Sequence, residues 1–321
     1  MTQTGLVTVG EAMLRLSPPY GESLRTSPSL NVTIGGAELN VAIAAQRMGL
    51  ESSWASRLPR GVLGDRIQDH ARGYGVEPII SPADERVGIY FAEVGPEPRG
   101  VTVTYDRDHS ASRGLSVSDF SSDELLKEKS AVFTSGITIS LGLNVREFIS
   151  RLYSDALQAC RYFEVNFRSK LVSPENMRAW VVELLPTVDV LFASKFDLTD
   201  LLGFGPDLEK ASKFARDEFE LQYVVVPDRA GRVGELGLNS VYVFGDSGEV
   251  HVECPGFIVD PIGAGDAAAG ALIASLEMGL SIEDAALYSV RAAAWTQTHF
   301  GDAAQFSRDE IVNFDERRVR R

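Results

Sequence analysis

Short apolar runs alternate with helical patterns along most of the chain, and this alternation restricts the fold more than any other feature. Three such runs, rich in β-branched or aromatic residues and ending at small residues, are GLVTVG (5–10), AVFTSG (131–136) and VDVLFAS (188–194). Runs of this kind are typical of buried strands, and helical spacing follows, for example from about Asn144 to Cys160. The pattern predicts an α/β fold, a doubly wound and mainly parallel sheet with helices on both faces and ligands at the carboxyl ends of its strands.

One segment departs from this alternation. GIYFAEVG (88–95) and GVTVTYDR (100–107) alternate apolar and polar residues, and the four residues PEPR between them suit a hairpin loop. We therefore expect a half-exposed antiparallel hairpin there. Towards the C-terminus the sequence predicts strands at 223–228, 241–246 and 249–256, followed only by helices at 264–278, 283–296 and 307–315.

The charge balance excludes one class of partner. The 321 residues include 45 acidic and 31 basic side chains, a formal net charge of −14, whereas nucleic-acid binding depends on neutralising phosphates with Lys and Arg. No stretch approaches the roughly 18 apolar residues that span a bilayer, and MTQTGLVTVG lacks the pattern of a signal peptide. We expect a soluble, cytoplasmic protein that binds neither nucleic acid nor membrane. The scattered cysteines and histidines indicate neither a disulfide framework nor a zinc site.

The stretch DPIGAGDAAAG (260–270) places glycines immediately before a helical pattern that runs from about Ala267. Glycines let the backbone approach a ligand closely, and the N–H groups of a first helical turn, helped by the helix dipole, attract negative charge. A phosphoryl group needs such surroundings. Asp266 in this loop has two interpretations, a carboxylate that caps the helix or a catalytic base beside an anion site. The spacing alone leaves both open.

The same loop resembles a family signature. DPIGAGDA looks like the C-terminal signature of the ribokinase-like (PfkB) carbohydrate kinases, and GGAELNVA (35–42) resembles their N-terminal sugar-binding motif. GEAMLRLSPP, VTYDRDHSA and VNFRSKL resemble the 2-keto-3-deoxygluconate kinases within that family, and the likeness runs from about residue 6 to 302. The resemblance implies a doubly wound α/β kinase domain with a small β-sheet lid over the sugar. The kinase domain would comprise residues 1–14, 31–80 and 108–321, and the lid residues 15–30 and 81–107.

The resemblance also implies roles for individual residues. Asp266 matches the base that takes the proton from the attacking sugar hydroxyl, and the neighbouring backbone matches the anion hole that stabilises the phosphoryl oxygens. The anion-hole residues are Gly263, Ala264 and Gly265. The residues that match substrate-binding groups are Gly36, Asn40, Tyr90, Tyr105, Arg107, Arg168 and Asp302. The implied cofactors are ATP and Mg²⁺, and the implied assembly is a homodimer formed through the lid.

Two arginines make a sugar acid the expected substrate. A 2-keto acid carries a carboxylate, which the guanidinium fork of Arg107 or Arg168 can bind through two hydrogen bonds. The alternative for both is a surface ion pair in an acid-rich protein, which suits Arg168 less because it belongs to the predicted strand RYFEVNFR (161–168). Tyr90 and Tyr105 could equally pack across the hairpin. Asp302 could equally cap a helix.

The positions that match the family's nucleotide- and metal-binding motifs depart from the family pattern. Glu164 stands where the family's Asp-x-Asn-x-Arg motif has Asp, and Ser194 and Asp197 occupy the two ends of its Asn-x-x-Glu motif. Asp197 and Glu164 are the candidate metal ligands, since Mg²⁺ commonly retains water in its shell and a shorter carboxylate can reach the ion through it. The candidate nucleotide-binding residues are Ser194, Asp197, Arg229, Gly263 and Gly265.

These features predict a kinase that moves the γ-phosphate of ATP to the terminal hydroxyl of 2-keto-3-deoxygluconate or a close analogue, giving the 6-phosphate. Two alternatives stay open. One is the same chemistry on a neutral sugar such as fructose, and the other is a sugar-acid-binding homologue without activity, which the altered Ser194–Asp197 segment would permit. Asp266 argues against the binding protein, because binding needs no base. A nicotinamide-dependent dehydrogenase finds little support, since no GxGxxG fingerprint follows the first strand.

Overall fold

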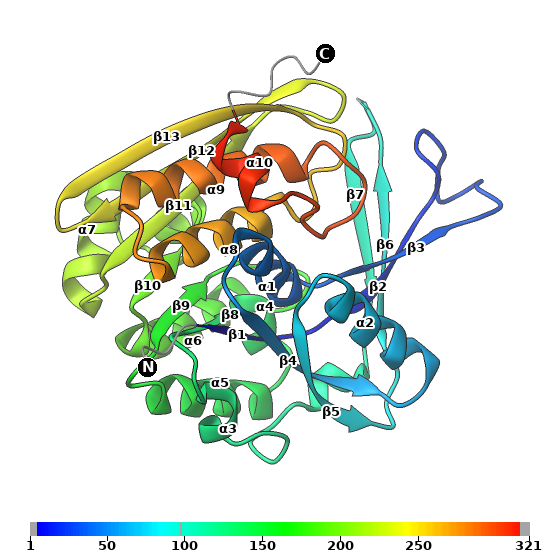
Figure 1. Cartoon of the computed structure of the whole chain (residues 1–321), viewed down its shortest axis with the longest axis horizontal. Coiled ribbons are helices and arrows are strands. Elements are labelled where there is room, and N and C mark those ends of the chain that lie inside the picture. Colours follow the sequence, from blue (N-terminus) through cyan, green and yellow to red (C-terminus); the bar gives the residue numbers. More distant parts are fainter. Residues whose placement is uncertain (1–4, 97, 315–321) are drawn as a thin grey trace.

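The computed structural model describes residues 5–96 and 98–314, which form two β-sheets and the helices packed on them (Figure 1). The larger sheet has nine strands in the order β13-β12-β11-β10-β9-β8-β1-β4-β5. These strands are β1 (Leu6–Val9), β4 (Ser52–Pro59), β5 (Glu77–Ala83), β8 (Ala131–Ser135), β9 (Cys160–Glu164), β10 (Val190–Phe192), β11 (Tyr223–Ala230), β12 (Leu236–Gly245) and β13 (Gly248–Phe257). Neighbours from β5 to β11 pair in parallel, and β12 and β13 pair antiparallel. The predicted mainly parallel α/β sheet is therefore confirmed.

Helices cover both faces of the larger sheet (Figure 1). They are α1 (Ala37–Met48), α2 (Val62–Gly73), α3 (Ser122–Leu126), α4 (Gly136–Ile139), α5 (Leu143–Asp155), α6 (Pro174–Leu184), α7 (Leu208–Phe219), α8 (Ala264–Glu277), α9 (Ile282–Thr296) and α10 (Arg308–Val312). Several begin where a serine side chain accepts a hydrogen bond from a first-turn N–H group, as Ser173 does for α6 and Ser281 for α9. The shorter helical turns are Ala111–Gly114, Leu185–Thr187 and the π-helical segment Asp197–Leu201.

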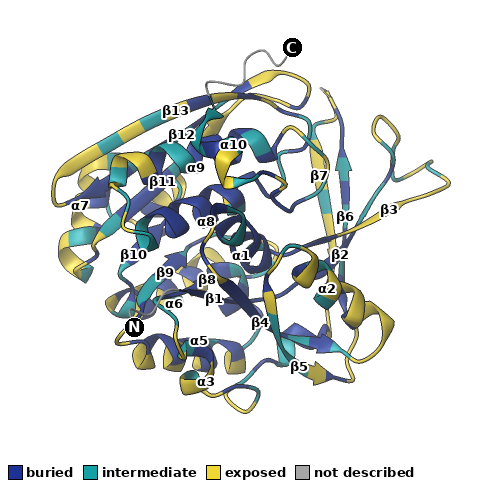
Figure 2. Cartoon of the chain, in the orientation of Figure 1, coloured by how far each residue is buried: buried dark blue, intermediate teal, exposed yellow. Residues whose placement is uncertain are grey.

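Successive strand residues point to opposite faces of the sheet, and each face has its own apolar core. Leu6 and Phe133 pack on the side of α1, α8 and α9, whereas Val7 and Val132 pack on the side of α5, α6 and α7. Figure 2 shows the strands buried between these two helical layers. Because helices cover both faces, a ligand reaches this sheet at the ends of its strands.

The sequence analysis does not predict the segment β4, α2 and β5. β4 lies between β1 and β5 and buries Ser52, Ser53 and Ser56, so the strand lacks a continuous apolar run. The helix predicted at 307–315 is shorter, because α10 ends at Val312, and residues 315–321 lie outside the described ranges.

The smaller sheet has four strands in the order β3-β2-β6-β7, and we refer to it as the lid. Its strands are β2 (Met13–Ser17), β3 (Asn31–Gly35), β6 (Gly88–Val94) and β7 (Val101–Asp106). The antiparallel pairing of β6 with β7 is the predicted hairpin, while β2 pairs in parallel with β6 and antiparallel with β3. The expected domain division left residues 31–35 in the kinase domain, whereas every residue of β3 pairs with β2 in the lid.

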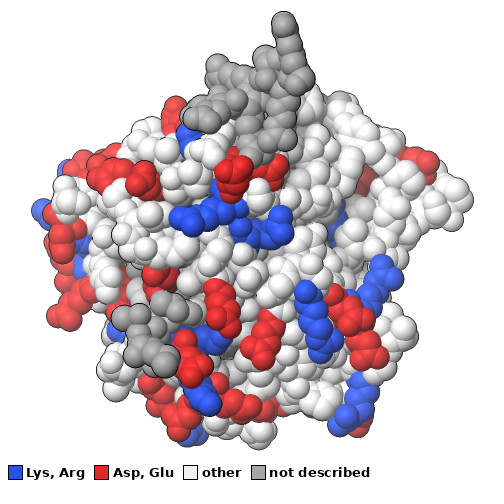
Figure 3. All heavy atoms as spheres, viewed as in Figure 1, with Lys and Arg blue, Asp and Glu red and all other residues white. Residues whose placement is uncertain are grey.

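Three further observations concern the chain as a whole. Within the described ranges, no helix combines the length and the apolar character needed to cross a membrane. Cys160 lies in β9 and Cys254 in β13, strands that are not neighbours in the sheet, so the described structure contains no disulfide between them. On the face drawn in Figure 3, the visible Lys and Arg side chains lie among Asp and Glu side chains, so its described surface carries mixed charge.

Candidate active site

A cavity of about 870 Å³ opens between the carboxyl ends of the parallel strands and the lid. Its wall combines residues that follow β9 and β10, the first turns of α1 and α8, and the lid strands β6 and β7. Every residue that the sequence analysis proposes for the site lines this cavity: Gly36, Asn40, Tyr90, Tyr105, Arg107, Glu164, Arg168, Ser194, Asp197, Arg229, Gly263, Ala264, Gly265, Asp266 and Asp302. The fold thus brings them together, and the role of each stays a prediction.

The glycines at the start of α8 shape the proposed anion site. Gly263 caps the helix with a φ of 85°, a left-handed conformation that favours glycine, and an added Cβ there would lie 2.0 Å from the carbonyl oxygen of Asp302. Gly265 differs, because an added Cβ would meet no atom within 4 Å. The first-turn N–H groups of α8 lack partners within the helix and carry its positive dipole end. This turn can therefore bind a phosphoryl oxygen.

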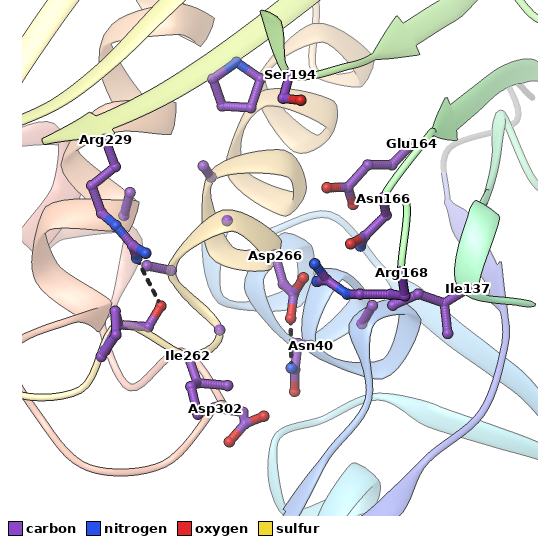
Figure 4. A pocket seen from close by; sticks show the side chains of 18 of the residues that line it. Asn40, Ile137, Glu164, Asn166, Arg168, Ser194, Arg229, Ile262, Asp266 and Asp302 are labelled. Carbon is purple, nitrogen blue, oxygen red and sulfur yellow. Dashed lines mark hydrogen bonds between the residues drawn. The ribbon is translucent and has the colours of Figure 1, made fainter. Parts of the chain in front are cut away.

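Asp266 lies in the first turn of α8, and the Asn40 amide donates a hydrogen bond of 2.7 Å to its Oδ2 (Figure 4). Burial raises the pKa of Asp266 to about 7. The Asn40 hydrogen bond and Arg168 lower this pKa, while the charges of Asp302 and Glu38 raise it. A carboxylate whose pKa lies near neutrality can take a proton from a hydroxyl group, which a helix cap does not require. Gly263 is the N-cap of α8 and no side chain makes a cap hydrogen bond there, so Asp266 is a first-turn carboxylate rather than the cap, and its role as a base stays a prediction.

Glu164, the last residue of β9, fits a bound cation. Its Oε2 is buried without a hydrogen-bond partner, and burial together with the charge of Asp266 raises its pKa to about 8. Within residues 5–96 and 98–314, no group of three His, Cys, Asp or Glu side chains could hold a metal by itself. Mg²⁺ commonly takes one or two carboxylates and completes its shell with water and phosphate. The site thus suits an ion that enters together with a nucleotide.

Asp302 makes short hydrogen bonds through both of its oxygens. Oδ1 accepts from Nη1 of Arg15 at 2.7 Å, and Oδ2 accepts from the hydroxyl of Tyr90 at 2.5 Å. Burial raises the pKa of Asp302, and the charge of Arg15 opposes this effect. Asp302 does not act as the helix cap considered above. Sequence analysis misses Arg15, because it lies 287 positions from Asp302 and nothing in its neighbourhood along the chain marks this contact.

Arg107 lies on the lid side of the cavity and is 5% exposed, so it is not a member of a surface ion pair. Its Nη1 lies 3.4 Å from Oε2 of Glu11, and its guanidinium stacks on the ring of Tyr105 at 4.4 Å. Nε and Nη1 make no hydrogen bond. The rings of Tyr90 and Tyr105 lie 5.9 Å apart, so these tyrosines pack across the hairpin and also line the cavity. Glu11 is a buried lining residue that the sequence analysis misses.

Arg168 does not belong to a strand, which corrects one expectation. β9 ends at Glu164, opposite Phe192 at the end of β10, and Asn166 then adopts a left-handed φ of 39°. Arg168 follows in the loop with an exposed side chain that extends towards Asp266 (Figure 4). No described residue accepts a hydrogen bond from its guanidinium. Its charge lowers the pKa of both Asp266 and Glu164.

Ser194 and Asp197 hydrogen bond to each other. The backbone N–H and the hydroxyl of Ser194 donate to Asp197 Oδ2 at 2.9 and 2.7 Å, and the Asp197 N–H donates to Ser194 Oγ at 3.1 Å. This arrangement caps a helical turn and leaves Asp197 less available to a metal than Glu164. Arg229 donates to the carbonyl of Pro261 at 3.0 Å and thereby contacts the loop before α8 (Figure 4). The sequence analysis misses the lining residues of β12 and α9, which carry no recognisable motif: Asn239, Ser240, Ser289, Val290 and Ala293.

An anion site at a helix start beside a carboxylate of raised pKa suits the transfer of a phosphoryl group to a hydroxyl. The fold and the cavity thus define a class, kinases of small hydroxylated substrates. The sequence comparison narrows it, since residues 3–308 match the pfkB family carbohydrate kinases. The chain belongs to this family and is a sugar kinase.

Two relatives with assigned activities are similar over nearly the whole chain. The 2-dehydro-3-deoxygalactonokinase of Haloferax volcanii is 37% identical over 312 residues, which cover 95% of each chain. The 2-dehydro-3-deoxygluconokinase of Thermoproteus tenax is 29% identical over 295 residues, covering 90% of this chain and 87% of the relative.

Solved structures agree with the fold. The crystal structure of 2-dehydro-3-deoxygluconokinase from Thermotoga maritima has a TM-score of 0.92 and 32% identity, covering 97% of this chain and 99% of that one. A putative ribokinase II from E. coli, solved in complex with ATP and Mg²⁺, has a TM-score of 0.85 at 21% identity. The match covers 98% of this chain and 99% of that one. At that identity the likeness concerns the fold alone.

Proposed function

We propose that this kinase transfers the γ-phosphate of ATP to the terminal hydroxyl of a 2-keto-3-deoxy sugar acid. The substrate would be 2-keto-3-deoxygluconate or its epimer 2-keto-3-deoxygalactonate. The names of two relatives support this substrate class, because each is a kinase of a 2-dehydro-3-deoxy sugar acid, 2-dehydro being another term for 2-keto. The two acids differ only in the configuration at one carbon atom, so a single cavity can accept both.

The observation that carries the proposal is the pair of arginines in the cavity. Arg107 is buried with two nitrogen atoms that make no hydrogen bond, and Arg168 extends its guanidinium into the same space. Buried donors without acceptors are costly, and a substrate carboxylate would satisfy them through charge-assisted hydrogen bonds. The oxygen atoms of a neutral sugar could also accept these hydrogen bonds, but without a negative charge the bonds would be weaker.

The chemistry follows from the start of α8. Ionised Asp266, held by Asn40, takes the proton of the attacking hydroxyl, and the first-turn N–H groups stabilise the charge on the transferring phosphoryl oxygens. Arg168 favours the ionised form of Asp266, since its charge lowers the pKa of that carboxyl group. Mg²⁺ held by Glu164 and the nucleotide would neutralise phosphate charge. The lid excludes water that would otherwise compete with the sugar hydroxyl.

A coupled assay of ADP release tests the proposal with both epimeric acids, fructose and glucose as acceptors. We expect the wild type to prefer the acids. Arg107→Ala should raise KM for the preferred acid by about 10- to 100-fold, as expected for the loss of a charge-assisted hydrogen bond, with little change in KM for ATP. Arg86→Ala is the matched control, because Arg86 lies just before β6 and its ion pair with Asp106 of the lid is exposed.

The outcomes separate the alternatives. Preferred turnover of a neutral sugar, or full activity of Arg107→Ala and Arg168→Ala on the acid, would contradict the sugar-acid assignment. Absence of turnover on every acceptor would favour a binding protein without activity. Asp266→Asn should lower kcat by about 100-fold or more, as expected for the loss of a general base.

A further inference from the structure

A buried charged cluster behind the cavity wall joins the lid to the two loops that flank the start of α8. Arg15 in β2 donates from Nη1 to Asp302 at 2.7 Å and from Nη2 to Asp260 at 2.6 Å. The Tyr90 hydroxyl donates to the second oxygen of Asp302 at 2.5 Å. The side chains of Arg15, Asp260 and Asp302 are 2%, 0% and 5% exposed. We refer to these four residues as the Arg15 cluster.

Only half of the Arg15 cluster faces the cavity. Tyr90 and Asp302 line it, whereas Arg15 and Asp260 are not among its lining residues. Arg15 therefore lacks direct access to a bound sugar or nucleotide. Any effect of Arg15 on the reaction must pass through the groups that it holds.

The cluster fixes the turn that leads into α8. Asp260 accepts hydrogen bonds from the N–H groups of Ile262 at 3.1 Å and Gly301 at 3.2 Å, so it ties together the two loops. The carbonyl oxygen of Asp302 packs against Gly263 so closely that a Cβ added to this glycine would lie only 2.0 Å from it. A displacement of Asp302 would consequently displace the anion site at Gly263.

The cluster also contacts the sugar side of the cavity. A Cβ added to Gly35, at the end of β3, would lie 2.2 Å from the Tyr90 hydroxyl and 2.3 Å from Asp302 Oδ2. Gly35, which leads into the turn at Gly36, thus packs directly on the same two side chains. The lid, the sugar-binding turn and the phosphate-binding turn meet at one buried point.

Stability alone does not account for this arrangement. One guanidinium lies between two carboxylates, and the desolvation of buried charges offsets much of what their attraction contributes to folding. The Arg15 guanidinium instead fixes geometry, because its N–H donors point in fixed directions and can hold two acceptors at once. We propose that Arg15 is a positioning residue for phosphoryl transfer, which holds Asp302, Tyr90 and the turn at Gly263 in the arrangement that the reaction needs.

Arg15→Lys is the first test, because lysine keeps the charge and loses the fork. We expect kcat to fall by about 100-fold, the effect of a misplacement of about 1 Å at a reacting centre, while KM for ATP changes little. The matched control is Arg86→Lys, which alters an exposed lid ion pair and should leave kcat and both KM values unchanged. Each assay uses the sugar that the wild type phosphorylates best in the panel above, so a wrong substrate assignment would not affect this test.

A second variant tests whether the reaction depends on the positioning by the Arg15 guanidinium or on its charge. Arg15→Met combined with Asp260→Asn removes the guanidinium together with one of its two partner charges, and it should lower kcat as strongly as Arg15→Lys. Thermal unfolding of every variant is measured alongside, with kinetics taken well below the transition. The proposal is overturned if either variant melts earlier but keeps wild-type kcat and KM, since this would show a purely structural role.

Discussion

Asp266 gains its chemical character from neighbours that reach it from three different elements. Asn40 comes from α1, Arg168 from the loop after β9, and Asp302 from the loop after α9. Burial, the hydrogen bond from Asn40 and the charges of Asp302, Arg168 and Glu38 together bring the pKa of Asp266 to about 7. Because a general base must be ionised, kcat/KM should fall as the pH decreases through this value.

The fall of kcat/KM at low pH forms the acidic limb of the pH profile. Two substitutions should move this limb in opposite directions. Asn40→Ala removes a hydrogen bond that lowers the Asp266 pKa, so the limb should shift to higher pH. Glu38→Gln removes a negative charge that raises the same pKa, so the limb should shift to lower pH. The measurement is kcat/KM for the sugar from acidic to alkaline pH. Shifts of the same sign, or a limb that neither variant moves, would show that another group controls it.

Where a motif is local, the sequence predicts which residues line the cavity, although their roles stay predictions. The stretches GGAELNVA and DPIGAGDA lie in the first turns of two helices, so their spacing directly reflects the geometry that they form. Arg15 could not be found in this way, because its partners lie 245 and 287 positions away and only the fold brings them together. Glu11 and Glu38 escape notice for a related reason, since buried acids carry no periodic signal.

At the scale of elements, the start of α8 offers a test that separates folding from catalysis. Gly265→Ala should fold normally, because the added methyl group meets no atom within 4 Å, yet it should occupy space that the anion site needs. We expect kcat to fall by about 100-fold, comparable to the loss of an oxyanion donor. Gly263→Ala should instead lower the melting temperature, because its Cβ would clash with the Asp302 carbonyl. Wild-type kcat in Gly265→Ala would argue against an anion site at this turn.

Element boundaries depend on pairing, and this limits what a sequence can predict. RYFEVNFR keeps a strand-like pattern through residue 168, but the neighbouring strand β10 ends at Phe192, so pairing stops at Glu164. The released residues form a loop that turns Arg168 towards the cavity. β4 shows the opposite case, in which burial between two strands makes a serine-rich segment part of the sheet.

At the scale of the whole molecule, the lid is the proposed dimer interface. Val32 on the edge strand β3 is 38% exposed, and contact with a second copy would remove its apolar surface from water. We expect a dimer by light scattering after size-exclusion chromatography, and Val32→Asp should shift it towards the monomer. Val62→Asp on α2 is the control, because Val62 is 79% exposed outside the lid. A monomeric wild type, or an intact dimer in Val32→Asp, would contradict the proposal.

The lid is also discontinuous along the chain, which affects how it can come apart. Residues 13–35 supply β2 and β3, residues 88–106 supply β6 and β7, and the segment from α1 to β5 separates the two pairs. Each pair is therefore anchored to the α/β body by covalent bonds at both of its ends. A protease that cuts once between β2 and β3 releases no peptide, because each new end stays joined to the body through its own strand. A single cut in this connection would therefore leave all four strands of the lid attached to the protein.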